Sequence, residues 1–128
     1  MLNCELLFVY GSLRRGFGAQ GLMRRLRARY LGKGSVEGQL FDVGRFPAAV
    51  KAPRSRMRVV GELYRMPSAN RSFLRLDQYE GRSYSRDLAE VELQNGKRTR
   101  AWIYWMKRVP ASKRRIRGGD YATQSSEL

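Results

Sequence analysis

The segment 89–106 carries the most restrictive pattern in this chain. Apolar residues alternate with polar ones up to Leu93, and Asn95-Gly96 follows soon after. Alternation at every second residue is typical of a half-buried strand, and Asn-Gly between two such strands favours a tight hairpin turn. The return strand is wholly apolar over 101–106. We therefore predict a β-hairpin whose return strand lies at the centre of a sheet.

Two further β-prone segments contain a glycine where a strand would otherwise be continuous. Gly38 interrupts the segment 36–43, and Gly61 interrupts the segment 59–66. A glycine inside a strand marks a bulge or the close approach of another backbone. Two such strands predict a strongly curved or barrel-like sheet.

A first helix is expected at 21–30. Leu22, Leu26 and Tyr30 are spaced four residues apart, which places them on one side of a helix, while arginines fill the other sides. Gly32 follows at a position where a glycine often ends a helix. We interpret the arginines as a solvated face.

A second helix is expected within 67–81, because the segment begins with capping residues and ends at a glycine. Its apolar stripe ends at Leu76, and the next position on that side is Glu80. A carboxylate that points toward the core has a raised pKa, which suits a general base or acid. A second interpretation stays open, in which Glu80 lies past the last turn and pairs with Arg82 or Arg86.

Leu6–Val9 forms another expected strand, because consecutive apolar residues suit a strand that is buried on both faces. Gly11 and Ser12 follow, so a turn begins at the carboxyl end of this strand. Its free backbone N–H groups, the Ser12 hydroxyl and the cations Arg14 and Arg15 would suit an anionic group such as a carboxylate or phosphate. The alternative is an ordinary tight turn with solvated arginines.

Composition restricts the chemistry. The chain contains no histidine and a single cysteine, Cys4. Ser-His-Asp and Cys-His catalysis and the common histidine metal sites are therefore excluded, and we expect no metal, no cofactor and no internal disulfide. Acid–base chemistry would fall to Asp, Glu, Lys, Tyr or Cys. The cysteine content fits a reducing, cytoplasmic setting.

Length and charge bear on organisation and partners. A chain of 128 residues suits one domain, which we place at 1–121, with a disordered tail at 122–128. No apolar stretch approaches the roughly 20 residues of a membrane span, so no membrane is expected among its partners. The net charge of +15 attracts polyanions. Because the basic residues are dispersed and accompany no nucleic-acid motif, we expect non-specific nucleic-acid binding rather than a nucleic-acid function.

Several motifs, taken in order, resemble the gamma-glutamylcyclotransferase-like family, especially its small bacterial members and the gamma-glutamylamine cyclotransferases. They are Phe-Val-Tyr-Gly-Ser-Leu at 8–13, Leu-Asp-Gln-Tyr-Glu-Gly at 76–81, Tyr-Ser-Arg at 84–86 and Ala-Trp-Ile-Tyr at 101–104, and the likeness continues to 118–121. This resemblance implies an α+β fold, with a small curved mixed sheet or barrel and short flanking helices around a cavity.

The resemblance also implies a reaction. The α-amine of a gamma-glutamyl amine or peptide attacks its own side-chain amide carbonyl, which releases 5-oxoproline and the free amine. Glu80 would be the proton acceptor, and the loop whose backbone amides would hold the α-carboxylate is formed by Tyr10, Gly11, Ser12 and Leu13. Intramolecular attack already supplies proximity, so one carboxylate can carry the proton transfers. The alternative is a non-catalytic binding or regulatory module with a basic surface for an acidic partner.

Overall fold

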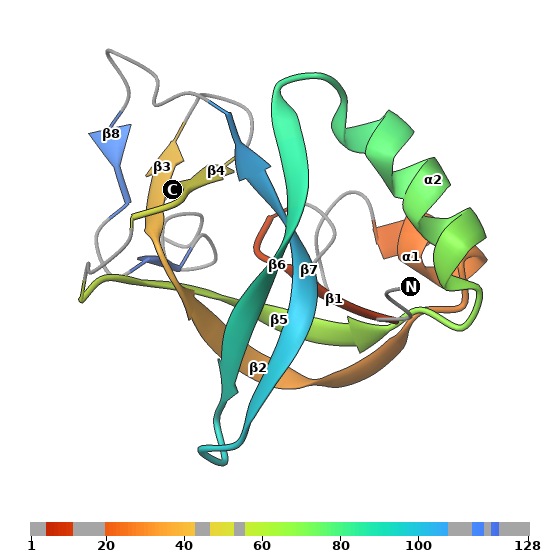
Figure 1. Ribbon diagram of the computed structural model, residues 1–128, viewed down its shortest axis with the longest axis horizontal. Helices are drawn as coiled ribbons and strands as arrows, with labels where there is room; N and C mark the ends of the chain where they lie inside the picture. The colour runs from red at the N-terminus through yellow and green to blue at the C-terminus, as the bar shows by residue number, and fades with distance from the viewer. Residues whose placement is uncertain are drawn as a thin grey trace.

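The computed structural model describes residues 5–11, 20–42, 47–52, 56–107, 114–116 and 119–120. Their main feature is a closed barrel, in which the strands are ordered β1 (Leu6–Val9), β5 (Arg58–Arg65), β2 (Arg29–Glu37), β6 (Tyr84–Leu93) and β7 (Arg98–Met106). A 3-stranded sheet stands beside it in the order β4 (Pro47–Val50), β3 (Gln39–Asp42) and β8 (Arg114–Arg115). The helices α1 (Gln20–Arg25) and α2 (Ala69–Glu80) cover the opposite side of the barrel (Figure 1).

Strand β1 runs between two apolar cores. It pairs antiparallel with β5 and parallel with β7. Phe8 belongs to the core that fills the barrel, whereas Leu7 and Val9 belong to the core between the barrel and the helices. The prediction of a strand buried on both faces is therefore confirmed.

The hairpin predicted around Asn95-Gly96 is also confirmed. Strands β6 and β7 pair in one continuous antiparallel register from Tyr84 opposite Met106 to Glu92 opposite Arg98. Gly96 has a φ of 85°, which favours glycine at this turn. Strand β6 begins at Tyr84 and so extends farther toward the N-terminus than the predicted alternation. The return strand β7 lies between β6 and β1, which gives it the expected central position.

The strand glycines produce the close packing expected of them. A Cβ on Gly61 would lie 2.2 Å from the Val9 carbonyl oxygen, so only glycine allows the backbone of β5 to approach the end of β1 this closely. At Gly38 the predicted strand 36–43 divides into the end of β2 and the separate strand β3, where the Trp105 ring approaches the backbone. The barrel-like sheet is confirmed, and the single strand over 36–43 is corrected to two.

The first predicted helix is shorter than expected. Arg27 has a φ of 58°, which ends the helix in the left-handed conformation. The Ala28 N–H then donates to the Met23 carbonyl at 3.0 Å, as in a Schellman motif. Tyr30 and Gly32 consequently lie in β2, so placing Tyr30 on the helix and Gly32 at its cap was wrong. An arginine occupies the position where glycine is usual, and this hides the end of the helix in the sequence.

The second helix lies within its predicted segment, but Ser68 at its N-terminal cap makes no side-chain capping hydrogen bond. Phe73 and Leu76 are buried against the barrel, and Gly81, with a φ of 81°, ends the helix. No strand was predicted in the basic segment after Pro110, yet β8 pairs with β3 and Ile116 is buried. The tail predicted at 122–128 lies outside the described residues. None of the helices in the described ranges is long and apolar enough to cross a membrane.

Candidate active site

Glu80 is the last residue of α2, and its side chain is partly buried. Burial raises the pKa of its carboxyl group from the ordinary 4.5 to about 7. Its charge contributes to the raised pKa values of Tyr10, Tyr84 and Tyr104, which indicates that the carboxyl group lies near these side chains. A carboxyl group with this pKa can both accept and return a proton near neutral pH.

The three tyrosines around Glu80 remain protonated. Burial is the main cause that raises the pKa of each hydroxyl, and the charge of Glu80 adds to it. The Tyr10 hydroxyl donates to the Tyr104 carbonyl at 2.7 Å, and the Tyr84 hydroxyl donates to the Pro47 carbonyl at 3.3 Å. The site therefore contains neutral hydroxyl groups beside one titrating carboxyl group.

Gly11 brings the start of the loop after β1 to the same place. A Cβ on Gly11 would lie 2.9 Å from Pro47 Cγ, so the loop backbone passes directly against the residue whose carbonyl binds Tyr84. Tyr10 and Gly11 thus lie beside the tyrosines that surround Glu80. Ser12 and Leu13, the other expected loop residues, and the neighbouring arginines 14–15 lie outside the described residues.

The Tyr10 side chain has a structural role. Its hydroxyl is buried and engaged by the Tyr104 carbonyl, and a backbone hydrogen bond from Ala49 reaches it as well. These contacts tie β1 to β7 and β4. The expected contribution of Tyr10 to substrate binding concerns its backbone amide, so the side-chain contacts leave that expectation open.

Arg86 is paired with Asp77 rather than with Glu80. Its Nε and Nη2 atoms donate to the two carboxylate oxygens of Asp77 at 2.8 and 3.2 Å. The guanidinium carbon also lies 4.7 Å from the ring centroid of Phe73 and 4.6 Å from that of Trp102. This arrangement fastens α2 to the barrel one turn before Glu80. In the described part of the chain no ion pair joins Glu80 to Arg82 or Arg86. The pairing of Glu80 with one of these arginines, left open by the sequence, is therefore not observed.

Asp77 is the site residue that sequence reasoning missed. Burial opposes its ionisation, but hydrogen bonds from Arg86 and from the Tyr104 hydroxyl, the latter at 2.5 Å, outweigh burial and hold its pKa below the ordinary value. The one sequence signal was position, because residues three apart on a helix share a side. Its partners lie on β6 and β7, and no spacing rule identifies them.

Two further observations concern metal binding and cavities. Within these ranges, no cluster of three or more His, Cys, Asp or Glu side chains could hold a metal ion. A cavity of about 410 Å³ lies elsewhere, between Arg58 on β5, Glu90 on β6 and Trp105 on β7. Neither Gly11 nor Glu80 lines that cavity.

Comparison with known proteins identifies the family and the fold. Residues 7–123 match the family model described as gamma-glutamyl cyclotransferase, AIG2-like. The gamma-glutamylcyclotransferase family protein YtfP of Escherichia coli K12 is 32% identical over 116 residues, which are 90% of this chain and 94% of YtfP. The crystal structure of PH0828 from Pyrococcus horikoshii has a TM-score of 0.72 and 27% identity, covering 95% of this chain and 93% of PH0828. An AIG2-like protein from Mus musculus shares the fold, with a TM-score of 0.74, 22% identity, and coverage of 86% and 82%.

Proposed function

This chain belongs to the gamma-glutamyl cyclotransferase, AIG2-like family, and from that premise we propose that it is a cofactor-independent cyclotransferase for a gamma-glutamyl amine or peptide. The observation that carries the proposal is the Glu80 carboxyl group, whose pKa burial raises to about 7. Its charge acts on the hydroxyl of Tyr10, the first residue of the loop that we expect to hold the α-carboxylate of the substrate. The products are 5-oxoproline and a free amine.

The proposed chemistry needs one group that moves protons. The ionised Glu80 carboxylate binds the α-ammonium group of the substrate and then accepts a proton from it. The neutral amine attacks the side-chain amide carbon, so a C–N bond forms and closes the five-membered ring. Glu80 returns its proton to the amide nitrogen, and the original amide C–N bond breaks. The ring nitrogen then loses its second proton to Glu80, which passes it to the departing amine, so that the amine leaves as an ammonium ion and Glu80 is ionised again. Atoms and charges balance without any other reactant.

The surroundings of Glu80 support this role. The carboxyl group has no arginine partner among the described residues, because Arg86 is held by Asp77. An arginine at Glu80 would lower its pKa and weaken it as a base. The hydroxyl groups of Tyr84 and Tyr104 stay protonated, so they do not compete with Glu80 for the substrate's proton.

The loop that begins at Tyr10 supplies the second part of the site. We assign the α-carboxylate of the substrate to the backbone N–H groups of residues 10–13, since a turn at the end of a strand presents such donors. The close approach of Gly11 to Pro47 supports this placement, because the Pro47 carbonyl accepts the hydrogen bond of Tyr84, one of the tyrosines near Glu80. A carboxylate held here would leave the α-ammonium group within reach of Glu80.

The experiment is a screen of gamma-glutamyl amines and dipeptides for 5-oxoproline release, with wild type, Glu80→Gln and Glu90→Gln run in parallel. Glu90 is an exposed hairpin residue paired with Arg98, so it is the matched control. We expect Glu80→Gln to lower kcat/KM by at least about 100-fold, as for the loss of a general base. The Glu90 variant should keep wild-type turnover.

Two results would contradict the proposal. Full turnover by folded Glu80→Gln would exclude Glu80 as the proton acceptor. Binding of gamma-glutamyl compounds by the wild type, with no 5-oxoproline from any of them, would instead indicate the non-catalytic binding module.

A further inference from the structure

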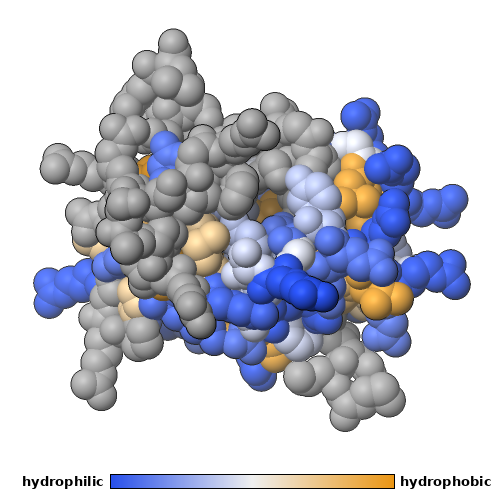
Figure 2. Space-filling model, turned by 90° about the horizontal axis from the view of Figure 1, so that it is seen from above, coloured by the Kyte–Doolittle hydropathy of each residue, from blue (hydrophilic) through white to orange (hydrophobic). Residues whose placement is uncertain are grey.

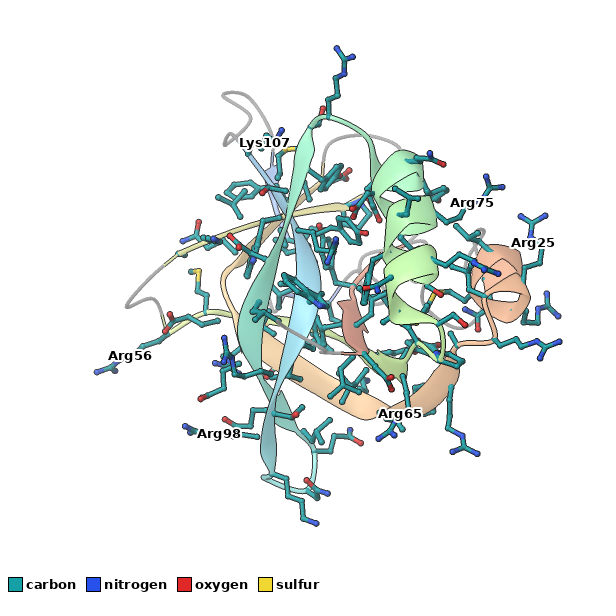
Figure 3. The ribbon with its side chains drawn as sticks, turned by 45° about the vertical axis from the view of Figure 1, so that its right-hand side comes forward. Arg25, Arg56, Arg65, Arg75, Arg98 and Lys107 are labelled. Atoms are coloured by element: carbon teal, nitrogen blue, oxygen red, sulfur yellow. The ribbon has the colours of Figure 1, made fainter. Side chains whose placement is uncertain are left out.

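The side of the molecule that carries the helices is covered by arginines. We call this surface the arginine face; it comprises the exposed residues Arg24, Arg25, Arg29, Arg65, Arg71 and Arg75. Figure 2 shows hydrophilic side chains gathered on the right, over the helices, with hydrophobic ones between them. In Figure 3, Arg25, Arg65 and Arg75 project from this side into solvent. The residues come from α1, β2, β5 and α2, so folding assembles a surface that is dispersed in the sequence.

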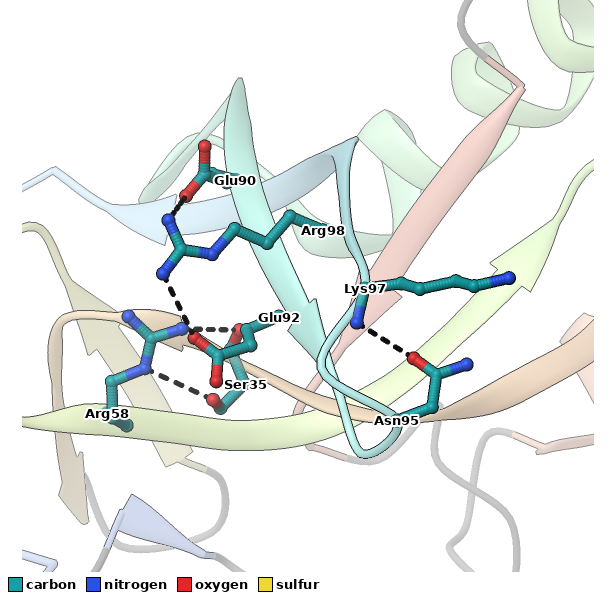
Figure 4. Close-up of polar contacts among 7 residues, drawn as sticks. All are labelled: Ser35, Arg58, Glu90, Glu92, Asn95, Lys97 and Arg98. Carbon is teal, nitrogen blue, oxygen red and sulfur yellow. Dashed lines mark hydrogen bonds and ion pairs between the residues drawn. The ribbon is translucent and has the colours of Figure 1, made fainter.

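The arginine face lacks neutralising partners. Among the described residues, none of its arginines takes part in an ion pair. The hairpin differs, because Arg98 contacts Glu90 at 3.2 Å and Glu92 at 3.7 Å (Figure 4). Within the described ranges, positive charge is therefore paired with carboxylates at the hairpin, whereas the arginine face has no ion pairs.

Strand pairing places two of these arginines side by side. Arg29 on β2 lies directly opposite Arg65 on β5 in the antiparallel register. Like charges at facing positions of a sheet repel each other and destabilise the pair. A polyanion bound across both strands would remove this repulsion, since its phosphates neutralise both guanidinium groups.

Exposed aromatic and apolar side chains lie between the arginines. On α2, Arg71, Arg75 and Tyr79 follow one another at four-residue spacing, so they share one exposed side of the helix. Tyr79 is 48% exposed and Leu74 on the same helix is 64% exposed. Tyr30, which is 40% exposed, follows Arg29 at the start of β2. Arginine interleaved with exposed tyrosine is the combination by which proteins hold single-stranded nucleic acid.

We propose that the arginine face binds single-stranded nucleic acid, with phosphates on the arginines and unpaired bases on Tyr30 and Tyr79. Guanidinium groups recognise phosphate through paired N–H donors, and tyrosine rings stack on bases that are not in a duplex. This activity is separate from the cyclotransferase proposal. A membrane surface fits less well, because α2 buries its apolar residues Phe73 and Leu76 and exposes Leu74 among polar neighbours.

The test measures binding of a fluorescein-labelled 20-nucleotide oligouridine by fluorescence anisotropy between 50 and 300 mM NaCl. The variant Arg71→Glu/Arg75→Glu should raise Kd at least tenfold at 50 mM NaCl. Each phosphate contact on a single strand contributes about 0.7 to the salt slope, so losing two contacts should flatten it by about 1.4. The control Lys97→Glu/Arg98→Glu makes the same charge change on the hairpin, and it should raise Kd by less than about threefold.

Further measurements separate specific binding from the effects of misfolding and of net charge. Circular dichroism establishes that both double variants are folded, and Glu80→Gln should bind the oligonucleotide with unchanged Kd. Oligouridine should bind at least tenfold more tightly than an RNA duplex of that length or poly-L-glutamate of equal charge. If the two double variants lost the same affinity for oligouridine, net charge alone would explain the binding, and the proposal would be overturned. Equal binding of poly-L-glutamate, or binding to phosphatidylserine vesicles without binding to RNA, would also overturn it.

Discussion

Asp77 and Glu80 lie one turn apart on α2, yet their carboxyl groups have opposite properties. Asp77 accepts hydrogen bonds from Arg86 and Tyr104, which hold its pKa below the ordinary value. Glu80 has no ion-pair partner in the described part of the chain, and burial raises its pKa to about 7. The same helix thus carries one carboxylate that is ionised at neutral pH and one whose pKa lies near neutral pH.

The comparison shows how the environment assigns roles to similar groups. A carboxylate satisfied by a cation and a hydroxyl is a good structural anchor and a poor base. A carboxyl group that burial destabilises as an anion is available for proton transfer. Arg86 links the two roles, because its attachment to Asp77 fixes the helix and keeps the guanidinium group away from Glu80. We therefore infer that Asp77 helps to position the end of the helix that carries Glu80.

The largest effect on stability should come from breaking the ion pair between Asp77 and Arg86. Asp77→Asn removes the charge that faces the partly buried Arg86, and we expect the free energy of unfolding at pH 7 to fall by about 1–2 kcal/mol, since solvent screens part of this pair. Urea unfolding monitored by circular dichroism measures this change in the free energy of unfolding. Asp87→Asn is the matched control, because its pair with Lys51 is exposed and should contribute about 0.5 kcal/mol or less. If both variants lost the same free energy of unfolding, Asp77 would contribute no more to stability than an exposed ion pair.

A smaller effect of opposite sign is expected at Glu80. The folded protein holds a proton on Glu80 up to a pH of about 7, whereas the unfolded chain releases it near 4.5. Ionising Glu80 therefore costs stability, and this cost appears as pH rises from about 4.5 through about 7. Glu80→Gln avoids the cost. The full shift corresponds to roughly 3 kcal/mol, but solvent screens this partly exposed group, so the variant should be more stable than wild type by about 1 kcal/mol at pH 8.

The pH dependence of that difference is the sharper criterion. At pH 4 the wild type and Glu80→Gln should have similar free energies of unfolding, because Glu80 is then protonated in both the folded and unfolded states. A variant that loses stability at pH 8 would show that Glu80 is stabilised as an anion, like Asp77. The folded protein would then stabilise the ionised form of both carboxyl groups, and the contrast between Asp77 and Glu80 would be lost.

The sequence predicted the framework because its signals are local. Asn95-Gly96 with flanking alternation specifies a hairpin, and Gly61 signalled a close strand crossing that the Val9 carbonyl explains. The position of Glu80 on the apolar side of a helix was likewise readable from helical spacing. Each of these signals is contained within one element or one turn.

The features that sequence reasoning missed depend on contacts between distant segments. The first helix ends at Arg27, which has an unusual φ for a non-glycine residue, and a hydrogen bond to Met23 stabilises this end. The pairing of Asp77 with Arg86 joins α2 to β6, and opposite charge alone does not select it among many arginines. Residues that meet only after the chain folds leave no periodic signal.

The most direct measurement of the central claim is a ¹³C NMR titration of the side-chain carboxyl carbons, with Glu80→Gln and Asp77→Asn used to assign the two signals. It requires no knowledge of the substrate. We expect Glu80 to titrate with a midpoint of about 7 and Asp77 to titrate below its ordinary value of 3.8. A midpoint near 4.5 for Glu80 would contradict the account, because the carboxyl group would then be an ordinary surface acid.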